Sequence, residues 1–253
     1  TSDLPVIVLH SLGRGAPSSA RMNFSSLMVF EPVRGVTSLT NPPVVASRGG
    51  LQVRGSSTEG YPKSSYKVEL WDDANLDRRT SLLGLPADSD WVLYAPNNFD
   101  VPLIHNPFVH QLSRDSGMYS PRTRFVEVFQ NKTTGGVGTN HYVGIYVLEE
   151  KIKIGSQRVA IDELEAENLT PPSVTGGYLL KIDRLDPGDG GLSGAGAQVG
   201  FVDPKEREIE LPQRKPQLDY LRTHFSNCVP IEHGHGAALR DLHQSRVGPP
   251  HAG

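Results

Sequence analysis

The sequence predicts an α+β fold in which an antiparallel sheet carries one packed helix. Two segments, Leu51–Gly55 and Ser65–Leu70, alternate polar and apolar residues, as half-buried strands do. Two more strongly apolar segments, Arg124–Gln130 and His141–Leu148, are separated by a polar, glycine-rich stretch. This arrangement is typical of an antiparallel hairpin. The chain therefore contains at least two strand pairs that can share one sheet.

The helix is expected between these strand pairs, over Asp100–Ser116. Asp100 is positioned to act as its N-cap, and Pro102 falls in the first turn, where proline is tolerated. Gly117 then ends the helical pattern. Four apolar residues recur at helical spacing and should form the face that packs on the sheet: Ile104, Phe108, Val109 and Leu112.

Length and composition narrow the class of protein. A chain of 253 residues can form one large domain or two lobes. Its net charge of −3 argues against a protein that binds nucleic acid by neutralising phosphates. The single cysteine, Cys228, excludes a disulfide framework and a cysteine-based metal site, and it fits a reduced cytosol as well as an exported bacterial protein. No apolar run approaches the length of a membrane span.

The connection between the first two strands is the candidate anion site. Arg54 precedes it, Ser56 and Ser57 lie within it, and Lys63 and Lys67 follow it. A guanidinium beside exposed backbone N–H groups suits an anion, and an inward-pointing strand lysine can bridge phosphate oxygens. The alternative interpretation is a pair of solvated strand lysines.

Acidic residues elsewhere could complete such a site. Glu149, Glu150 and Lys151 directly follow a strong strand and are either a charged hinge between lobes or a solvated strand end. Asp100 and Glu127 are carboxylates that could hold a cationic strand residue in place. Asp100 could equally be only a helix cap, and Glu127 an outward-facing strand residue.

Lys181 and Asp183 lie at the end of another apolar strand, Gly177–Ile182, where active-site residues often occur. A surface ion pair is the alternative for these two residues. From residue 230 onward the chain is rich in His, Gly and Pro, and it has no framework that could orient metal ligands. No metal site is predicted there or elsewhere.

Taken together, these segments resemble the spore-coat protein H (CotH) family of atypical kinases. The resemblance covers Ser2–Phe225, which is most of the chain, and it sets residues 1–229 apart from an irregular tail at 230–253. Its specific parts are the RGSS…PKSSY block and the LPADSDWVLYAP block. The matching segments are SDLPVIVL, LQVRGSSTEGYPKSSYKVEL, LLGLPADSDWVLYAPNNFDVPLIHNPFVHQLSRDSG, PRTRFVEVFQN, HYVGIYVLEEKI, GGYLLKIDR and, more weakly, FVDPKEREIELPQRKPQLDYLRTHF.

The resemblance implies a protein-kinase-like small lobe, made of an antiparallel sheet plus one helix, followed by an incomplete large lobe. It implies ATP as phosphate donor, Mg or Mn as divalent metal, and phosphorylation of Ser or Thr in protein partners. In spore formers those partners are coat proteins. Elsewhere such domains often occur on exported or surface proteins, so a bacterial, extracellular or cell-surface location is expected.

The resemblance also suggests roles for particular residues. The hairpin around Arg54 would cover the phosphates, Lys63 matches the lysine of the family's PKxSY pattern, and adenine would dock at a hinge after Leu148. The expected nucleotide-binding residues are Arg54, Ser56, Ser57, Lys63, Lys67, Glu149, Glu150 and Lys151. The expected supporting residues are Asp100, Asn106, Lys181 and Asp183.

The chain departs from the family pattern in several places. His105 stands before Asn106 where the family usually has Arg, and Ser64 replaces the second lysine of the usual pair. The family's catalytic and metal-binding aspartates lie beyond the segment that matches Gln217–Phe225, and their motifs are missing here. Because kinase chemistry needs those carboxylates, we expect a fragment with very weak or no catalysis.

A non-catalytic function is the alternative that these departures favour. The chain could be a surface or coat-assembly module that binds protein through sheet edges and aromatic side chains. The aromatic residues considered for this role are Trp91, Tyr94, Tyr142 and Tyr146.

Overall fold

The computed structural model describes residues 2–55, 58, 60–97, 100–182, 190–194 and 197–227. The chain divides into two compact units, with the boundary after Val159. Each unit is described by itself below.

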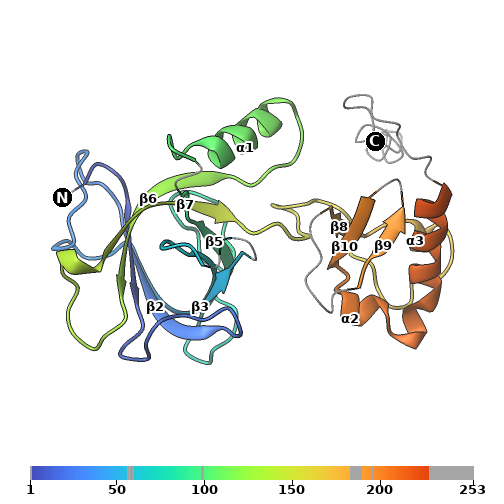
Figure 1. The fold of residues 1–253 in the computed structure, drawn as a ribbon, viewed down its shortest axis with the longest axis horizontal. Coiled ribbons are helices and arrows are strands. Elements are labelled where there is room, and N and C mark those ends of the chain that lie inside the picture. Colours follow the sequence, from blue (N-terminus) through green and yellow to red (C-terminus); the bar gives the residue numbers. More distant parts are fainter. Residues whose placement is uncertain are drawn as a thin grey trace, which may run out of the picture. The chain divides into compact units, whose positions relative to one another are not determined.

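The first unit is a closed barrel of seven strands (Figure 1). Neighbouring strands around the barrel follow the order β1-β2-β3-β4-β5-β7-β6. The strands are β1 (Val6–His10), β2 (Asn23–Phe30), β3 (Val45–Arg54), β4 (Ser65–Trp71), β5 (Asp90–Tyr94), β6 (Thr123–Asn131) and β7 (Tyr142–Glu150), with a short 3₁₀ turn η1 (Thr139–His141) before β7.

The strand β1 closes the barrel. It pairs antiparallel with β2 on one side, with Val6 opposite Phe30, and parallel with β6 on the other, with Val6 opposite Glu127. This parallel contact overturns the predicted fold class. The unit is a closed barrel made mostly of sheet, and not an α+β, kinase-like small lobe with an open antiparallel sheet. The antiparallel pairings β3–β4 and β6–β7 are confirmed.

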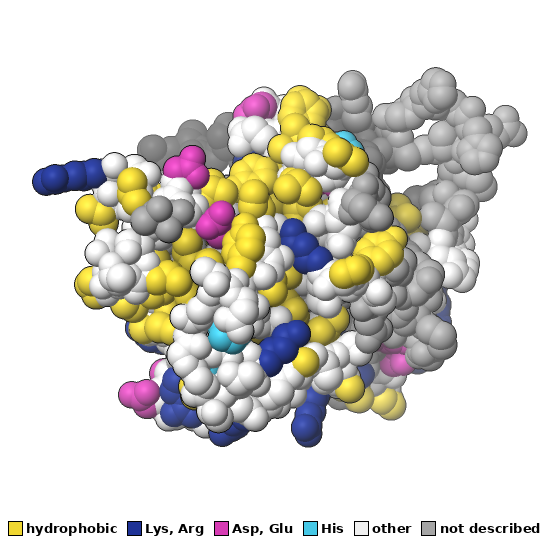
Figure 2. All heavy atoms as spheres, turned by 60° about the vertical axis from the view of Figure 1, so that its left-hand side comes forward, with side chains coloured by type: hydrophobic (Ala, Val, Ile, Leu, Met, Phe, Trp, Pro, Cys, Tyr) yellow, Lys and Arg dark blue, Asp and Glu magenta, His cyan; other side chains and the backbone are white. Residues whose placement is uncertain are grey.

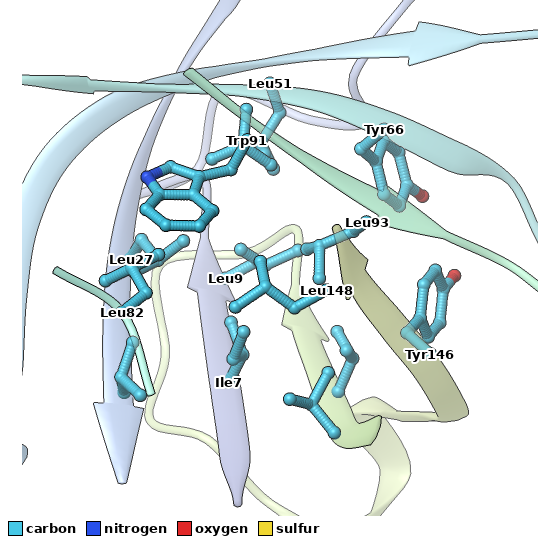
Figure 3. Close-up of a cluster of buried hydrophobic side chains, with 14 of the residues drawn as sticks. Ile7, Leu9, Leu27, Leu51, Tyr66, Leu82, Trp91, Leu93, Tyr146 and Leu148 are labelled. Carbon is cyan, nitrogen blue, oxygen red and sulfur yellow. The ribbon is translucent and has the colours of Figure 1, made fainter. Parts of the chain in front are cut away.

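The barrel interior holds the main hydrophobic core (Figure 3). Trp91 and Leu93 point inward from β5, and Tyr146 and Leu148 point inward from β7; all four side chains are almost fully buried. Alternation along the strands explains this arrangement, because every second residue faces the same side of a sheet. The rings of Tyr66 and Tyr146 stack with centroids 6.3 Å apart.

The helix α1 (His105–Asp115) contacts the outside of the barrel near β6 (Figure 1). It begins at His105, and not at Asp100 as predicted, because residues 100–103 form turns in which Leu103 N–H donates to the Asp100 carbonyl. Pro107 is its only fully buried residue among those described. The apolar face that was expected to pack on the sheet is exposed: Ile104, Phe108, Val109 and Leu112.

The second unit is small and mixed. A three-stranded sheet in the order β8-β10-β9 packs with α3, and buried residues such as Ile209 and Leu221 form its core. Its elements are η2 (Ser173–Thr175), β8 (Leu179–Lys181), β9 (Leu192–Gly194), β10 (Ala197–Asp203), α2 (Glu206–Ile209), η3 (Pro212–Arg214) and α3 (Lys215–Asn227).

Within the described part of the chain, no helix is both long enough and apolar enough to cross a membrane. The expected irregular tail at 230–253 lies outside the described residues.

Candidate nucleotide site

The candidate site lies on the outer face of the barrel, across β3, β4, β5 and β7. Lys67 on β4 pairs with Val92 on β5, and Val92 pairs with Glu149 on β7. Directly paired residues point to the same side of a sheet. Since Trp91 and Leu93 point into the barrel, Lys67, Val92 and Glu149 share its outer face.

Glu149 is the most unusual group on this face. Only 8% of the residue is exposed, and its Oε1 atom is buried without a hydrogen-bond partner among the described residues. Burial raises the pKa of Glu149 to about 7, although the positive charge of Arg54 acts in the opposite direction. A buried carboxylate with a free oxygen is costly, because desolvation is not offset by a bond. Such groups are concentrated at functional sites.

Tyr94 and Asp100 extend the site toward α1. Burial raises the pKa of the Tyr94 hydroxyl, with smaller contributions from the charges of Asp100 and Glu149. The Asp100 carboxylate is fully buried and accepts hydrogen bonds from the backbone N–H groups of Ile104 and His105. Its role is therefore to cap the start of α1, one of the two predicted alternatives. Asn106, the other supporting residue expected on this helix, is half-buried in its first turn.

Lys63 is held by backbone carbonyls. Its Nζ donates to the carbonyl oxygen of Pro96 at 3.2 Å and to that of Ile145, and it stands 4.6 Å from the ring centre of Tyr146. Burial lowers the pKa of this ammonium group. No carboxylate among the described residues forms an ion pair with it. Lys63 is thus a half-buried cation without a neutralising anion, unlike the solvated lysine of the alternative interpretation.

The other two cations have different surroundings. Lys67 forms an ion pair with Glu69, with 2.7 Å between Nζ and Oε1. Arg54 is exposed at the end of β3 and lies close enough to Glu149 to influence the pKa of its carboxyl group. The structure therefore links Arg54 to Glu149, whereas Lys67 is neutralised by a residue of its own strand.

Glu150 belongs to a separate cluster, which we call the Glu150 network. Its carboxylate accepts hydrogen bonds from Arg122 Nε at 2.8 Å and from an Arg158 guanidinium nitrogen at 2.9 Å. Arg158 also stands 3.6 Å from Asp88 and 5.6 Å from the ring centre of Trp91. Sequence reasoning missed this network, because its members come from distant segments and no local motif connects them.

Lys151 also has a structural ion pair. Its Nζ lies 3.0 Å from Asp90 Oδ1. Lys153 contacts the other Asp90 oxygen at 2.9 Å, and together the two lysines hold the pKa of Asp90 low despite its burial. These two ion pairs connect the segment that follows β7 to Asp90 at the start of β5.

The remaining predicted residues are Lys181, Ser56, Ser57, Asp183 and Glu127. Lys181 ends β8 in the second unit. Ser56, Ser57 and Asp183 lie outside the described residues. Glu127 accepts a hydrogen bond from the Tyr142 hydroxyl on the neighbouring strand. Across the described ranges, no cluster of three or more His, Cys, Asp or Glu could hold a metal ion, so we derive no step through a metal.

A second surface feature lies outside the candidate site. An open groove of about 530 Å³ crosses β2, β3 and the end of β4. Its walls include Arg48, Arg78 and Trp71, together with Asp72 and Asp73. Both signs of charge are present in the groove, so its electrostatics favour no particular class of ligand.

The chain matches a known protein family. The family model described as CotH kinase protein matches residues 51–227. This range contains β4 to β7 and α1, most of the second unit, and the residues Arg54, Lys63, Lys67 and Glu149. No curated protein matches the chain significantly.

Proposed function

The chain belongs to the CotH kinase family, and from this premise we propose that it carries the ATP-binding part of a protein Ser/Thr kinase. The nucleotide extends from Lys67 and Glu149, on the outer face of β4 and β7, to Lys63, which lies against the ring of the inward-pointing Tyr146. Arg54 and Lys63 neutralise its phosphates, with Lys67, which is ion-paired with Glu69, beside them. A protein partner supplies the Ser or Thr acceptor. ATP would be bound with Mg or Mn.

The observation that carries this proposal is the state of Lys63 and Glu149. Both are withdrawn from water, yet neither is paired with an opposite charge at bonding distance among the described residues. A protein normally pairs or neutralises such groups. Lys63 contacts the Ile145 carbonyl, four residues along β7 from Glu149, which is a span of about 13 Å in a strand. An extended anionic ligand with hydrogen-bond donors, such as a nucleotide triphosphate with its base amine, is long enough to satisfy both groups.

Lys63 is suited to bind phosphate as a point charge. Its carbonyl partners fix the ammonium position without cancelling its charge, and among the described residues they occupy two of its three N–H donors. A phosphate oxygen placed there would also raise the lowered pKa of Lys63, because an adjacent anion favours the charged form. Nucleotide binding and protonation of Lys63 are therefore coupled.

Two structural observations weaken the alternative function, a non-catalytic surface or coat-assembly module. Trp91 and Tyr146 are buried in the barrel core and cannot contact a partner. The barrel is closed, so its strands offer no free sheet edge in the described part of this unit. The exposed face of α1 still favours protein binding, as does Tyr142, which is 45% exposed.

A thermal-shift experiment on the whole chain tests the proposal. ATP with Mg²⁺ or Mn²⁺ should raise the melting temperature, because a ligand that binds only the folded state stabilises it by mass action. Lys63→Met should reduce this shift severalfold. Lys215→Met is the matched control, since Lys215 is an exposed lysine of α3 paired with Asp219, and it should leave the shift unchanged.

Two results would contradict the proposal. The first is a melting temperature that does not respond to nucleotide at millimolar concentration. The second is an equal response in the wild type and in Lys63→Met, which would remove Lys63 from the site.

A further inference from the structure

The inner face of the barrel becomes polar at the end where β1 and β6 finish. Gln130 on β6 is directly paired with Leu9 on β1, whose side chain belongs to the core, so Gln130 points to the same side. Ser11 is two residues after Leu9 and also faces inward. Asn23 and Ser25 of β2 line the same space. Hydroxyl and amide groups therefore surround a small pocket at this end of the barrel.

Two buried polar atoms of this pocket have no hydrogen-bond partner in the described part of the chain, Gln130 Nε2 and Ser11 Oγ. Only 7% of Gln130 and 8% of Ser11 is exposed. The Tyr66 hydroxyl donates to Gln130 Oε1 at 3.3 Å, which leaves Nε2 as the unfilled donor of this amide. Unpaired buried groups of this kind are costly, so the pocket offers two hydrogen-bond donors to a ligand.

A turn after β1 brings a guanidinium group to the same pocket. Leu12 and Gly13 have φ angles of 52° and 79°, and the Gly13 N–H donates to the Thr133 carbonyl at 3.0 Å. This turn sets Arg14 Cζ 4.6 Å from the centre of the Phe24 ring, and both side chains line the pocket. Arg14 is exposed, so the pocket has a positioned cation at its opening.

The charge at the pocket is positive. Arg14 and Lys132 are the charged members of its described lining, and neither forms an ion pair with a described carboxylate. On the face of the molecule drawn in Figure 2, Lys and Arg side chains are scattered among hydrophobic and polar ones. The preference for an anion therefore rests on the residues of this pocket and not on a broad basic surface.

The dimensions of the pocket limit the ligand. Its interior has a volume of about 10 Å³, which is room for one atom of the size of a water oxygen. A carboxylate fits this limit, because one oxygen can enter while the other stays at the opening. Arginine suits such a group through its parallel N–H donors. The half-buried Pro17 and Phe24 supply apolar surface for a short alkyl group.

We propose that this end of the barrel is a binding site for a small carboxylate. One carboxylate oxygen accepts hydrogen bonds from Gln130 Nε2 and Ser11 Oγ, and the other accepts from the Arg14 guanidinium. The mouth of a β-barrel is a common place for such a site. The described lining includes none of the residues proposed to bind nucleotide, so this site does not depend on the proposed kinase function.

An NMR titration of the isotope-labelled whole chain with sodium acetate tests the site. The Gln130 side-chain amide signals, assigned by their loss in Gln130→Glu, should shift in a saturable way. The dissociation constant should be millimolar, as expected for so small a ligand. Sodium chloride and sodium phosphate at equal ionic strength should bind more weakly.

Matched variants test the stated contacts. Arg14→Gln and Ser11→Ala should each weaken acetate binding about tenfold, because each removes a hydrogen bond to a charged group. Arg207→Gln makes the same charge change at an exposed arginine of α2, and it should leave the affinity unchanged. Because the Arg14 side chain is exposed, Arg14→Gln should keep the wild-type melting temperature.

Three results would overturn the proposal. Gln130 amide signals that do not respond to acetate would show that the pocket holds water alone. Chloride or phosphate binding as tight as that of acetate would rule out a carboxylate site. An acetate affinity that is unchanged in both Arg14→Gln and Ser11→Ala would remove these residues from the site.

Discussion

Two adjacent carboxylates at the end of β7 have opposite environments. Glu150 faces the barrel end and is bound by Arg122 and Arg158 at 2.8 and 2.9 Å. Glu149 faces the outside, is nearly as buried, and has an oxygen without a partner among the described residues. Alternation along the strand separates the two side chains. One environment stabilises the fold, and the other leaves a charge that a ligand can use.

The difference between Glu149 and Glu150 shows which property distinguishes structural from functional charges in this barrel. A burial value alone cannot do so, because both glutamates are buried. The distinguishing property is whether the hydrogen-bonding capacity of each carboxylate is filled by the protein itself. By this criterion Glu150 and Asp90 are structural, whereas Glu149 and Lys63 are available for binding.

The largest expected effect comes from Glu150→Ala. It would leave the buried guanidinium of Arg158 with only the more distant Asp88 as its anion. Breaking a buried ion pair from one side typically costs about 3–5 kcal/mol. Urea denaturation should show this loss. A loss below about 1 kcal/mol would mean that the Glu150 network contributes little to the stability of the barrel.

Glu149→Gln should change the free energy of unfolding in the opposite direction and stabilise the protein at high pH. The folded pKa of about 7 lies above the unfolded value, so the native state holds an extra proton between about pH 4.5 and 7. The stability that Glu149 contributes is therefore fully present below about pH 4.5 and is lost as the pH rises through 7. The glutamine variant should gain on the order of 2–3 kcal/mol at pH 8 and little at pH 5. Equal urea midpoints at pH 8 would contradict the raised pKa.

Arg54→Gln should sharpen the link between Arg54 and Glu149. Because the Arg54 charge lowers the pKa of Glu149, removing it should move the pH midpoint of the stability change upward. Arg54 is exposed, so its direct contribution to stability should stay below about 1 kcal/mol. An NMR titration of the Glu149 carboxyl carbon measures the change in its pKa. The control is Arg124→Gln, on strand β6, which pairs with β7.

The smallest effect is expected for Glu69→Gln, which removes the ion pair with Lys67. This pair is partly exposed, and such pairs contribute about 0.2–1 kcal/mol. The freed ammonium group should bind nucleotide phosphates as well as before or slightly better. Weaker nucleotide binding in this variant would show that Glu69 positions Lys67 for the ligand.

The local elements of the barrel could be predicted from the sequence. The alternation of polar and apolar residues predicted β3, which ends at Arg54, and β4, which begins shortly after Lys63. A polar, glycine-rich stretch predicted the β6–β7 hairpin. Helical spacing marked α1, although its start was placed at Asp100, five residues too early. These signals work because they depend on neighbours along the chain.

Long-range features could not be predicted in the same way. Helical spacing shows which residues share a face of α1, but it does not show that Phe108 and Leu112 face outward. Nothing near Glu150 in the sequence indicates that Arg122 will bind it, or that Asp88 will lie beside Arg158. Glu149 was selected as a possible hinge residue, whereas its buried, partly unpaired carboxylate becomes visible only once β5 and β7 are aligned.

The position of β1 has a practical consequence for recombinant work. A fragment cut at the limits of the family match would lack β1, β2 and the first half of β3. Without β1, β6 would expose the edge that pairs with it at Glu127–Asn131, and β4 would expose Glu69–Trp71, which pair with the removed half of β3. Unpaired N–H and C=O groups at such edges favour aggregation between molecules. Expression of the family-matched region without aggregation should therefore require the first 50 residues.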